Sequence, residues 1–152
     1  MKVAIIGSRG IKNINLEKFL PKDVSEIVSG GAIGVDTVAR NYALSHGIKL
    51  TEFLPQYNLY GRSAPLKRNI QIIEYADVVL AFWDRKSRGT KFVIDNCKKM
   101  NVPVQILVPI QQNNNRVGRN QSPSHTTVRA VRHTAVQFKI KYVLHFGSNP
   151  KY

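Results

Sequence analysis

The chain has 152 residues and a mass of 17.1 kDa, and its 23 lysine and arginine residues against 9 aspartate and glutamate residues give a formal net charge of +14. This length fits one compact domain, and the single cysteine, Cys97, excludes an internal disulfide and any cysteine-based zinc cluster. No apolar run approaches the length of a membrane span, about 18–20 residues, and the N-terminus opens in a strand-like run without a cleavable signal pattern. We therefore expect a cytoplasmic protein with no membrane partner, whose charge points to a phosphate-bearing partner.

The charge is distributed unevenly along the chain. Residues 1–110 hold 16 basic and 9 acidic side chains, whereas residues 111–152 hold 7 basic side chains and none that is acidic. The polar run from Gln111 to Asn115 has the composition of a linker. We therefore expect a domain over 1–110 and a basic C-terminal extension over 111–152.

Short apolar runs alternate with helical segments through the first 110 residues. We expect strands at Val3–Ile6, Ile27–Val28, Leu50–Leu54, Val78–Trp83 and Val102–Val108, and helices near 14–20, 35–46, 65–76 and 90–100. Strands that are apolar on both faces are typical of a parallel sheet covered by helices. This pattern predicts a doubly wound α/β domain with a mainly parallel, five-stranded sheet; a mixed sheet with one antiparallel edge is the alternative.

In the extension, the residues from Val136 to Tyr142 alternate between apolar and polar side chains, which indicates an amphipathic strand. This strand either adds to a sheet edge or stays outside the domain. Four arginines precede it, and they suit either nucleic-acid contact or a solvated basic tail: Arg116, Arg119, Arg129 and Arg132.

Glycines gather where the expected strands end, and the carboxyl ends of parallel strands meet along the edge of the sheet where ligands bind. The first such loop contains Gly7, Ser8 and Arg9, which offer a tight turn, a hydroxyl and a forked cation. The second loop is the run Ser29-Gly30-Gly31-Ala32-Ile33-Gly34-Val35-Asp36, which predicts a nest of backbone N–H donors for a phosphate. Asp36 suits either a ribose hydroxyl or the first turn of a helix.

Two later loops are rich in basic side chains. The long loop over 55–68 has Tyr57 and Tyr60, which suit either base stacking or surface packing, and several cations that suit either phosphate or solvent. The loop over 84–90 ends at a helix start, where free N–H groups favour an anion. The candidate phosphate or base contacts in these two loops and just beyond them are Arg62, Arg68, Asn69, Arg88, Gly89 and Thr90.

As an ordered set, these motifs resemble the SLOG superfamily, which includes the DNA-processing protein A and LONELY GUY groups. The stretches that carry the resemblance are Ile5–Arg9, Ser29–Asp36, Arg68-Asn69 and Ser87–Thr90. The chain looks most like the small YspA/YpsA-related members, and this resemblance covers nearly all of 1–110. The resemblance implies a Rossmann-like fold that binds a nucleotide or a nucleotide-derived ligand, with contacts from Gly30, Gly31, Gly34, Gly89 and Thr90.

Two branches of the superfamily suggest alternative functions. LONELY GUY enzymes cleave the N-glycosidic bond of nucleoside monophosphates through a Pro-Gly-Gly-x-Gly-Thr-x-x-Glu motif, but Val93 stands at the position of the glutamate here. Hydrolysis would then need a carboxylate from Asp36 or Glu74. The DNA-processing branch binds single strands, and its Ser-Gly-x-Ala-x-Gly-x-Asp pattern is similar to Ser29–Asp36.

We therefore expect a nucleotide-binding sensor or regulatory module rather than an enzyme, with single-stranded nucleic acid or a second copy of the chain as further possible partners. We expect no cofactor. We also expect no metal site, because the histidines His125, His133 and His145 lack the spacing of metal ligands.

Overall fold

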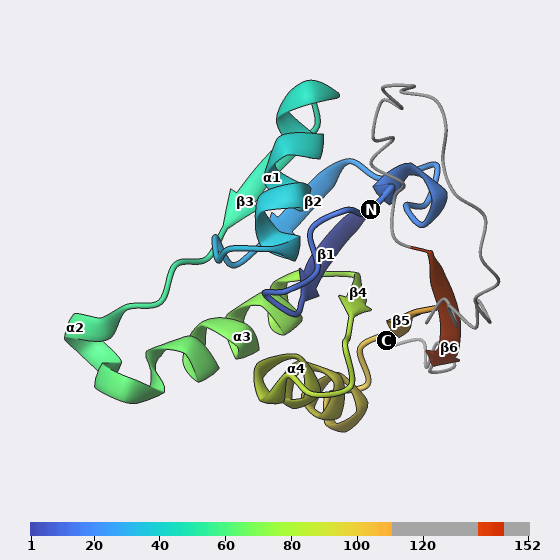
Figure 1. Ribbon diagram of the computed structural model, residues 1–152. Helices are drawn as coiled ribbons and strands as arrows, with labels where there is room; N and C mark the ends of the chain where they lie inside the picture. Colours follow the sequence, from blue (N-terminus) through green and yellow to red (C-terminus); the bar gives the residue numbers. More distant parts are fainter. Residues whose placement is uncertain (111–136, 145–152) are drawn as a thin grey trace, which may run out of the picture.

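Short strands that are apolar on both faces build the centre of the sheet. The computed structural model describes residues 1–110 and 137–144 (Figure 1). The expected linker, the four arginines of the extension and the histidines at 125, 133 and 145 lie outside the described residues. In chain order the strands and helices are β1 (Lys2–Gly7), η1 (Leu16–Lys18), β2 (Glu26–Ser29), α1 (Val35–Ser45), β3 (Lys49–Glu52), α2 (Tyr57–Tyr60), η2 (Gly61–Ser63), α3 (Ala64–Tyr75), β4 (Val78–Phe82), α4 (Arg88–Lys99), β5 (Val104–Pro109) and β6 (Phe138–Leu144).

The strands form one six-stranded sheet in the order β3-β2-β1-β4-β5-β6. The first five strands are parallel, and β6 pairs antiparallel with β5. The expected five-stranded sheet is therefore corrected to a mixed sheet with one antiparallel edge, which was the alternative. The reason is that the amphipathic strand expected at 136–142 forms and satisfies the open backbone groups along the edge of β5.

Helices cover both faces of the sheet because successive strand residues point to opposite sides. From β1, Val3 and Ile5 are fully buried in a cluster that includes the apolar residues of α1. Ala4 and Ile6 point the other way, into a cluster with α3 and α4. Figure 1 shows the same arrangement, with α1 on one side of the sheet and α3 and α4 on the other.

Two local expectations are wrong. The helix expected at 14–20 is only the single 3-10 turn η1, because Pro21 keeps the residue before it out of helical geometry. The first part of the loop expected at 55–68 is helical, as the short turns α2 and η2 over 57–63, whereas α3 agrees with the helix expected near 65–76 and carries Arg68. Across the described ranges, no helix combines the length and the apolar character needed to cross a membrane.

The order of the strands reverses between β1 and β4. From β1 the chain builds outward to β2 and β3, and it then crosses back to place β4 and β5 on the other side of β1. In open parallel sheets this reversal separates two neighbouring loops and leaves a crevice at the carboxyl ends of the strands. The candidate site is found there.

Candidate ligand-binding site

A cavity of about 160 Å³ lies where β1 and β4 end, between the first turns of α1 and α4 and one side of α3. We call it the Asp36 cavity. Its lining residues are Ile6, Gly7, Arg9, Ala32, Asp36, Pro65, Leu66, Arg68, Asn69, Ile72, Ser87, Gly89, Thr90 and Val93.

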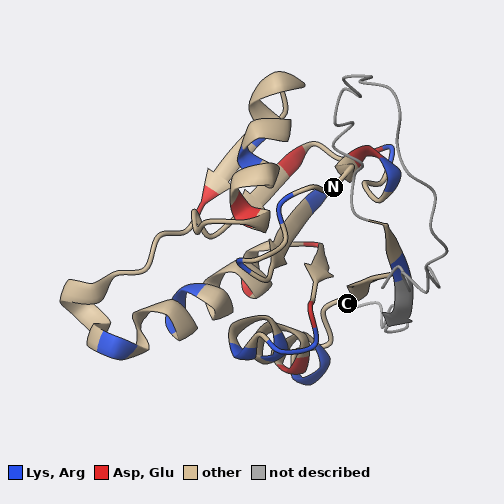
Figure 2. Cartoon of the chain, viewed as in Figure 1, with Lys and Arg blue, Asp and Glu red and all other residues tan. Residues whose placement is uncertain are grey.

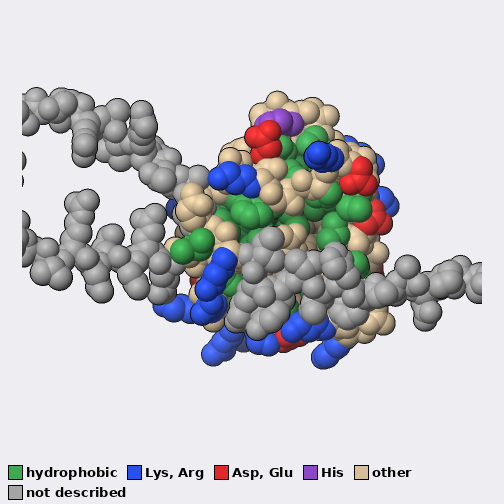
Figure 3. Space-filling model, turned by 90° about the vertical axis from the view of Figure 1, so that its right-hand side faces the viewer, with side chains coloured by type: hydrophobic (Ala, Val, Ile, Leu, Met, Phe, Trp, Pro, Cys, Tyr) green, Lys and Arg blue, Asp and Glu red, His purple; other side chains and the backbone are tan. Residues whose placement is uncertain are grey.

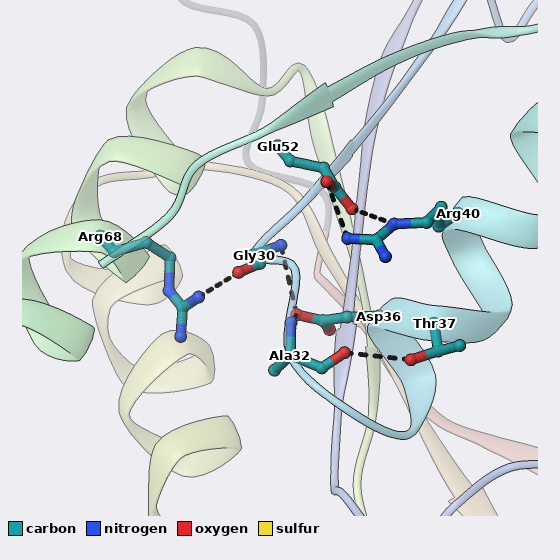
Figure 4. A network of polar contacts seen from close by, with 7 residues as sticks. All are labelled: Gly30, Ala32, Asp36, Thr37, Arg40, Glu52 and Arg68. Atoms are coloured by element: carbon teal, nitrogen blue, oxygen red, sulfur yellow. Dashed lines mark hydrogen bonds and ion pairs between the residues drawn. The ribbon is translucent and has the colours of Figure 1, made fainter. Parts of the chain in front are cut away.

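Asp36 organises the glycine-rich loop that precedes α1. Its side chain is buried, and its Oδ2 atom accepts the backbone N–H of Gly30 at 3.2 Å and that of Ala32 at 3.1 Å (Figure 4). A buried carboxylate requires such partners. The expected nest of phosphate-binding N–H groups is therefore partly wrong, because two of its donors bind a side chain of the loop itself.

Burial raises the pKa of Asp36 above its ordinary value, against the opposing influence of the Ala32 N–H and the Arg68 charge. Both backbone donors use Oδ2, so within the described residues Oδ1 has no hydrogen-bond partner. The cavity therefore contains a carboxylate oxygen that is able to accept a hydrogen bond.

Arg68 extends from α3 to the cavity and holds the glycine-rich loop on the side opposite Asp36. Its Nη1 donates to the carbonyl of Gly30 (Figure 4). Its Nε donates to Oδ1 of Asn69 at 2.9 Å. Burial lowers the pKa of Arg68, and the neighbouring Asp36 opposes that shift while Arg9 adds to it. An arginine side chain has five N–H donors, so several remain for a bound anion.

Three glycines near the cavity have close neighbours, which are backbone atoms at Gly7 and Gly34 and the end of a side chain at Gly30. A Cβ on Gly30 would lie 2.5 Å from Nη1 of Arg68, and one on Gly7 would lie 2.6 Å from the carbonyl oxygen of Phe82. Gly34 has a φ of +86°, and a Cβ there would lie 2.5 Å from the carbonyl oxygen of Arg9. These glycines allow the loops to cross closely, and that crossing holds Arg9 at the cavity.

The N-terminus of α4 forms another wall. Ser87 is the N-cap, and its Oγ accepts the N–H of Thr90 at 3.3 Å and contacts the Thr90 hydroxyl at 3.1 Å. Within the described residues, the N–H groups of Arg88 and Gly89 have no partner, as is usual in the first turn of a helix. A Cβ on Gly89 would meet no atom within 4 Å, so packing does not require glycine at this position.

The structure brings half of the predicted site residues to the cavity. The predicted residues that line it are Gly7, Arg9, Asp36, Arg68, Asn69, Gly89 and Thr90. The others lie outside the lining: Ser8, Ser29, Gly30, Gly31, Gly34, Arg62 and Arg88.

The residues outside the lining have roles or positions of their own. Ser8 is buried, and its Oγ accepts the N–H of Asp84 at 3.1 Å, which ties the end of β1 to the loop after β4. Ser29 is fully buried, and its hydroxyl has no partner within the described residues. Arg62 and Arg88 are exposed.

An apolar wall is the part of the site that was not predicted from the sequence. It includes Ile72 and Leu66 on α3 and Val93 on α4, which is 2% exposed. The signal was present as helical spacing, because Leu66, Asn69 and Ile72 recur every three residues, and so do Thr90 and Val93.

The side chains of the described ranges contain no group of three or more His, Cys, Asp or Glu residues placed to hold a metal ion. Cys97 is buried, and burial raises the pKa of its thiol to about 12. A thiol with that pKa remains protonated and is a poor nucleophile or metal ligand.

No protein-family model matches this chain, and no curated protein matches it either. The resemblance to SLOG proteins therefore depends on the motifs alone. The chemistry of the Asp36 cavity is the basis on which a function is assigned.

Proposed function

We propose that the Asp36 cavity binds the phosphate and ribose of a nucleotide or a nucleotide-derived ligand, and that the protein is a sensor or regulatory module. The observation that carries this proposal is the convergence of two arginines and a helix N-terminus on one cavity at the strand-order reversal. Arg9 comes from the loop after β1, Arg68 from α3, and the open N–H groups of Arg88 and Gly89 from α4.

The charges in the cavity favour an anion. Two guanidinium groups face one carboxylate, and Asp36 already accepts two backbone hydrogen bonds. Guanidinium groups recognise phosphate oxygens through paired hydrogen bonds. A phosphate beside Arg9 and Gly89 would balance the excess positive charge of the two guanidinium groups.

The rest of the nucleotide has matching surfaces. Oδ1 of Asp36 is positioned to accept a ribose hydroxyl, and the wall of Leu66, Ile72 and Val93 provides apolar contact for the sugar. At about 160 Å³ the cavity is smaller than the ligand pockets of about 300–1,000 Å³ that enclose whole ligands. We therefore infer that the base lies outside it, towards the exposed ring of Tyr57.

The geometry supports binding more than hydrolysis of the N-glycosidic bond. Asp36 is the one acidic residue among the lining residues, whereas glycoside chemistry commonly uses two carboxylates. Glu74 is exposed and lies outside the lining, and Asp95 is paired with Lys91 at 2.8 Å.

The fold is consistent with this proposal. We propose that it is a doubly wound, Rossmann-like domain of the SLOG type, which the strand order and the helices on both faces support. We also propose a cytoplasmic location, which the single buried, free cysteine supports.

The test compares Arg9, which lines the cavity, with Arg62, which does not. Isothermal titration calorimetry with a panel of nucleoside monophosphates is expected to identify a binder, and Arg9→Gln is expected to weaken it about tenfold, the size of one lost charge-assisted hydrogen bond. Arg62→Gln is the matched control, because Arg62 is equally exposed but lies outside the cavity lining. Failure of every nucleotide to bind the wild-type protein would refute the proposal, as would equal losses in the two variants.

A further inference from the structure

A second, larger hollow lies along the same edge of the sheet, beyond β4. It has a volume of about 510 Å³ and is formed by the loop after β4, the end of β5 and the start of β6. The pairing of Val108 with Lys139 brings the extension to this place. We call it the Arg85 hollow, and its lining residues are Asp84, Arg85, Lys86, Val108, Pro109, Ile110 and Lys139.

Three cations and one carboxylate line the hollow, so positive charge is in excess. Oδ1 of Asp84 accepts the N–H groups of Lys86 and Ser87, each at 2.8 Å, which holds this side chain within its own turn. Among the described residues, the ion pairs involve other lysines and arginines: Arg40, Lys49 and Lys91. Figure 2 shows the basic segment between β4 and α4, and Figure 3 shows basic side chains gathered low on the neighbouring face, at the level of α4.

The backbone conformation of Arg85 is a separate observation that supports a functional role for its side chain. Arg85 has a φ of +69°, a left-handed conformation that an arginine adopts at a cost and a glycine adopts freely. Asn101 is the other described non-glycine residue with positive φ, at +55°, and asparagine is well suited to that conformation. The chain therefore retains a strained arginine where glycine would fold more easily.

One loop separates the hollow from the Asp36 cavity. Ser87, Gly89 and Thr90 line the cavity, and Arg85 and Lys86, a few residues earlier, line the hollow. The loop is held in place by the bond from the Asp84 N–H to Ser8 and by the bond from Nε1 of Trp83 to the Ser87 carbonyl at 3.1 Å. A ligand seated in the cavity could extend over this fixed loop into the hollow.

We propose that the Arg85 hollow is a second phosphate subsite, and that the ligand is a nucleotide compound with two separated phosphate groups, one on each side of residues 84–90. This inference rests on the proposed function of the Asp36 cavity. Two sources supply this chemistry, a free dinucleotide and the end of a single strand of nucleic acid.

The experiment measures the affinity of the full chain for AMP, for the 5′-phosphorylated dinucleotide pApA and for a 5′-phosphorylated oligoadenylate. We expect pApA to bind about tenfold more tightly than AMP, because it adds a charge-assisted contact. Arg85→Gly is expected to remove this advantage, to leave the affinity for AMP unchanged, and to keep or raise the melting temperature. Asn101→Gly is the matched control, since it changes another left-handed residue and is expected to keep the advantage.

The outcomes distinguish the second phosphate subsite from the proposed function of the Asp36 cavity. Binding of AMP without any advantage for pApA, or an advantage that survives Arg85→Gly, would overturn the second subsite alone. Failure of AMP and pApA to bind would overturn this inference, whereas the proposed function is overturned only if every nucleoside monophosphate of the panel also fails to bind. When the subsite is supported, tighter and more salt-sensitive binding of the oligoadenylate than of pApA identifies a strand as the source, and equal binding identifies a free dinucleotide.

Discussion

At the scale of single residues, the hydrogen bonds of Asp36 change the function that the glycine-rich motif suggests. The run Ser29–Asp36 predicts backbone donors for a phosphate, but Asp36 binds the N–H groups of Gly30 and Ala32. The loop is therefore held in shape by its own carboxylate, and in our proposal the phosphate contacts come from Arg9, Arg68 and the start of α4, which line the cavity. Asp36 in turn becomes a buried acid with a raised pKa.

This raised pKa predicts a definite dependence of stability on pH. Below the ordinary value of 3.8 for the Asp36 carboxyl, the group is protonated in both the folded and the unfolded chain. As the pH rises from there through the higher pKa of the folded state, the unfolded chain releases its proton first, so the contribution of Asp36 to the free energy of unfolding falls. Above the folded-state pKa the loss is complete.

The measurement is the difference in free energy of unfolding between the wild type and Asp36→Asn, from urea denaturation at a series of pH values. Asparagine keeps an oxygen for the two N–H groups and does not titrate. We expect the wild type to lose stability relative to this variant as the pH rises above 3.8 and then to level off. A difference that is constant or that favours the wild type with rising pH would contradict the burial argument.

At the scale of elements, the site depends on how closely the loop after β1 crosses the start of α1. Gly34 precedes α1 with a φ of +86°, and the carbonyl oxygen of Arg9 lies 2.5 Å from the place of its missing Cβ. Gly47, just after α1, also has a positive φ of +64°, but a Cβ there would meet no atom within 4 Å. Gly34 therefore combines a glycine-specific backbone conformation with a close crossing, whereas Gly47 has a positive φ in open space.

We expect Gly47→Ala to lower the free energy of unfolding by about 1–2 kcal/mol, the cost of a left-handed non-glycine residue. Gly34→Ala is expected to cost a further 1–3 kcal/mol, approximately, because a φ of +86° with a ψ of −121° is a conformation that essentially only glycine adopts and because the two loops are forced apart. Urea denaturation of both variants measures the difference. Equal losses in the two variants would show that neither the backbone conformation of Gly34 nor the crossing adds to the cost.

At the scale of the whole molecule, the sequence predicted the alternation of strands and helices better than it predicted the edge of the sheet and the limits of the helices. The buried strands were recognisable because β1 and β4 are apolar on both faces, and the strand of the extension was recognisable from its alternation. Its pairing with β5 was not predictable, because an amphipathic strand does not specify its neighbour. The helical turns over 57–63 were missed because the glycine and prolines of this stretch suggested a loop, whereas the helix expected near 65–76 agrees with α3, where Pro65 is well tolerated in the first turn.

The pairing of β6 is expected to contribute to the stability of the whole domain. Phe138, at the start of β6, packs edge-on against Phe82 at 5.1 Å and Phe19 at 6.0 Å between ring centroids, and these two rings also contact each other. Phe82 is fully buried at the end of β4, so this aromatic group connects the extension to the core beside the candidate site.

Truncating this ring tests whether the extension belongs to the folding unit. Full burial of a phenylalanine is worth about 3–5 kcal/mol on truncation to alanine, and Phe138 is half-buried, so Phe138→Ala is expected to lower the free energy of unfolding by about 1–3 kcal/mol. The matched control is Phe92→Ala, because Phe92 is also half-buried but lies outside both core clusters of the described residues. A loss at Phe138 no larger than that at Phe92 would mean that the sheet is stable without β6. A larger loss with a single cooperative transition would mean that residues 137–144 fold together with the strands that carry the site.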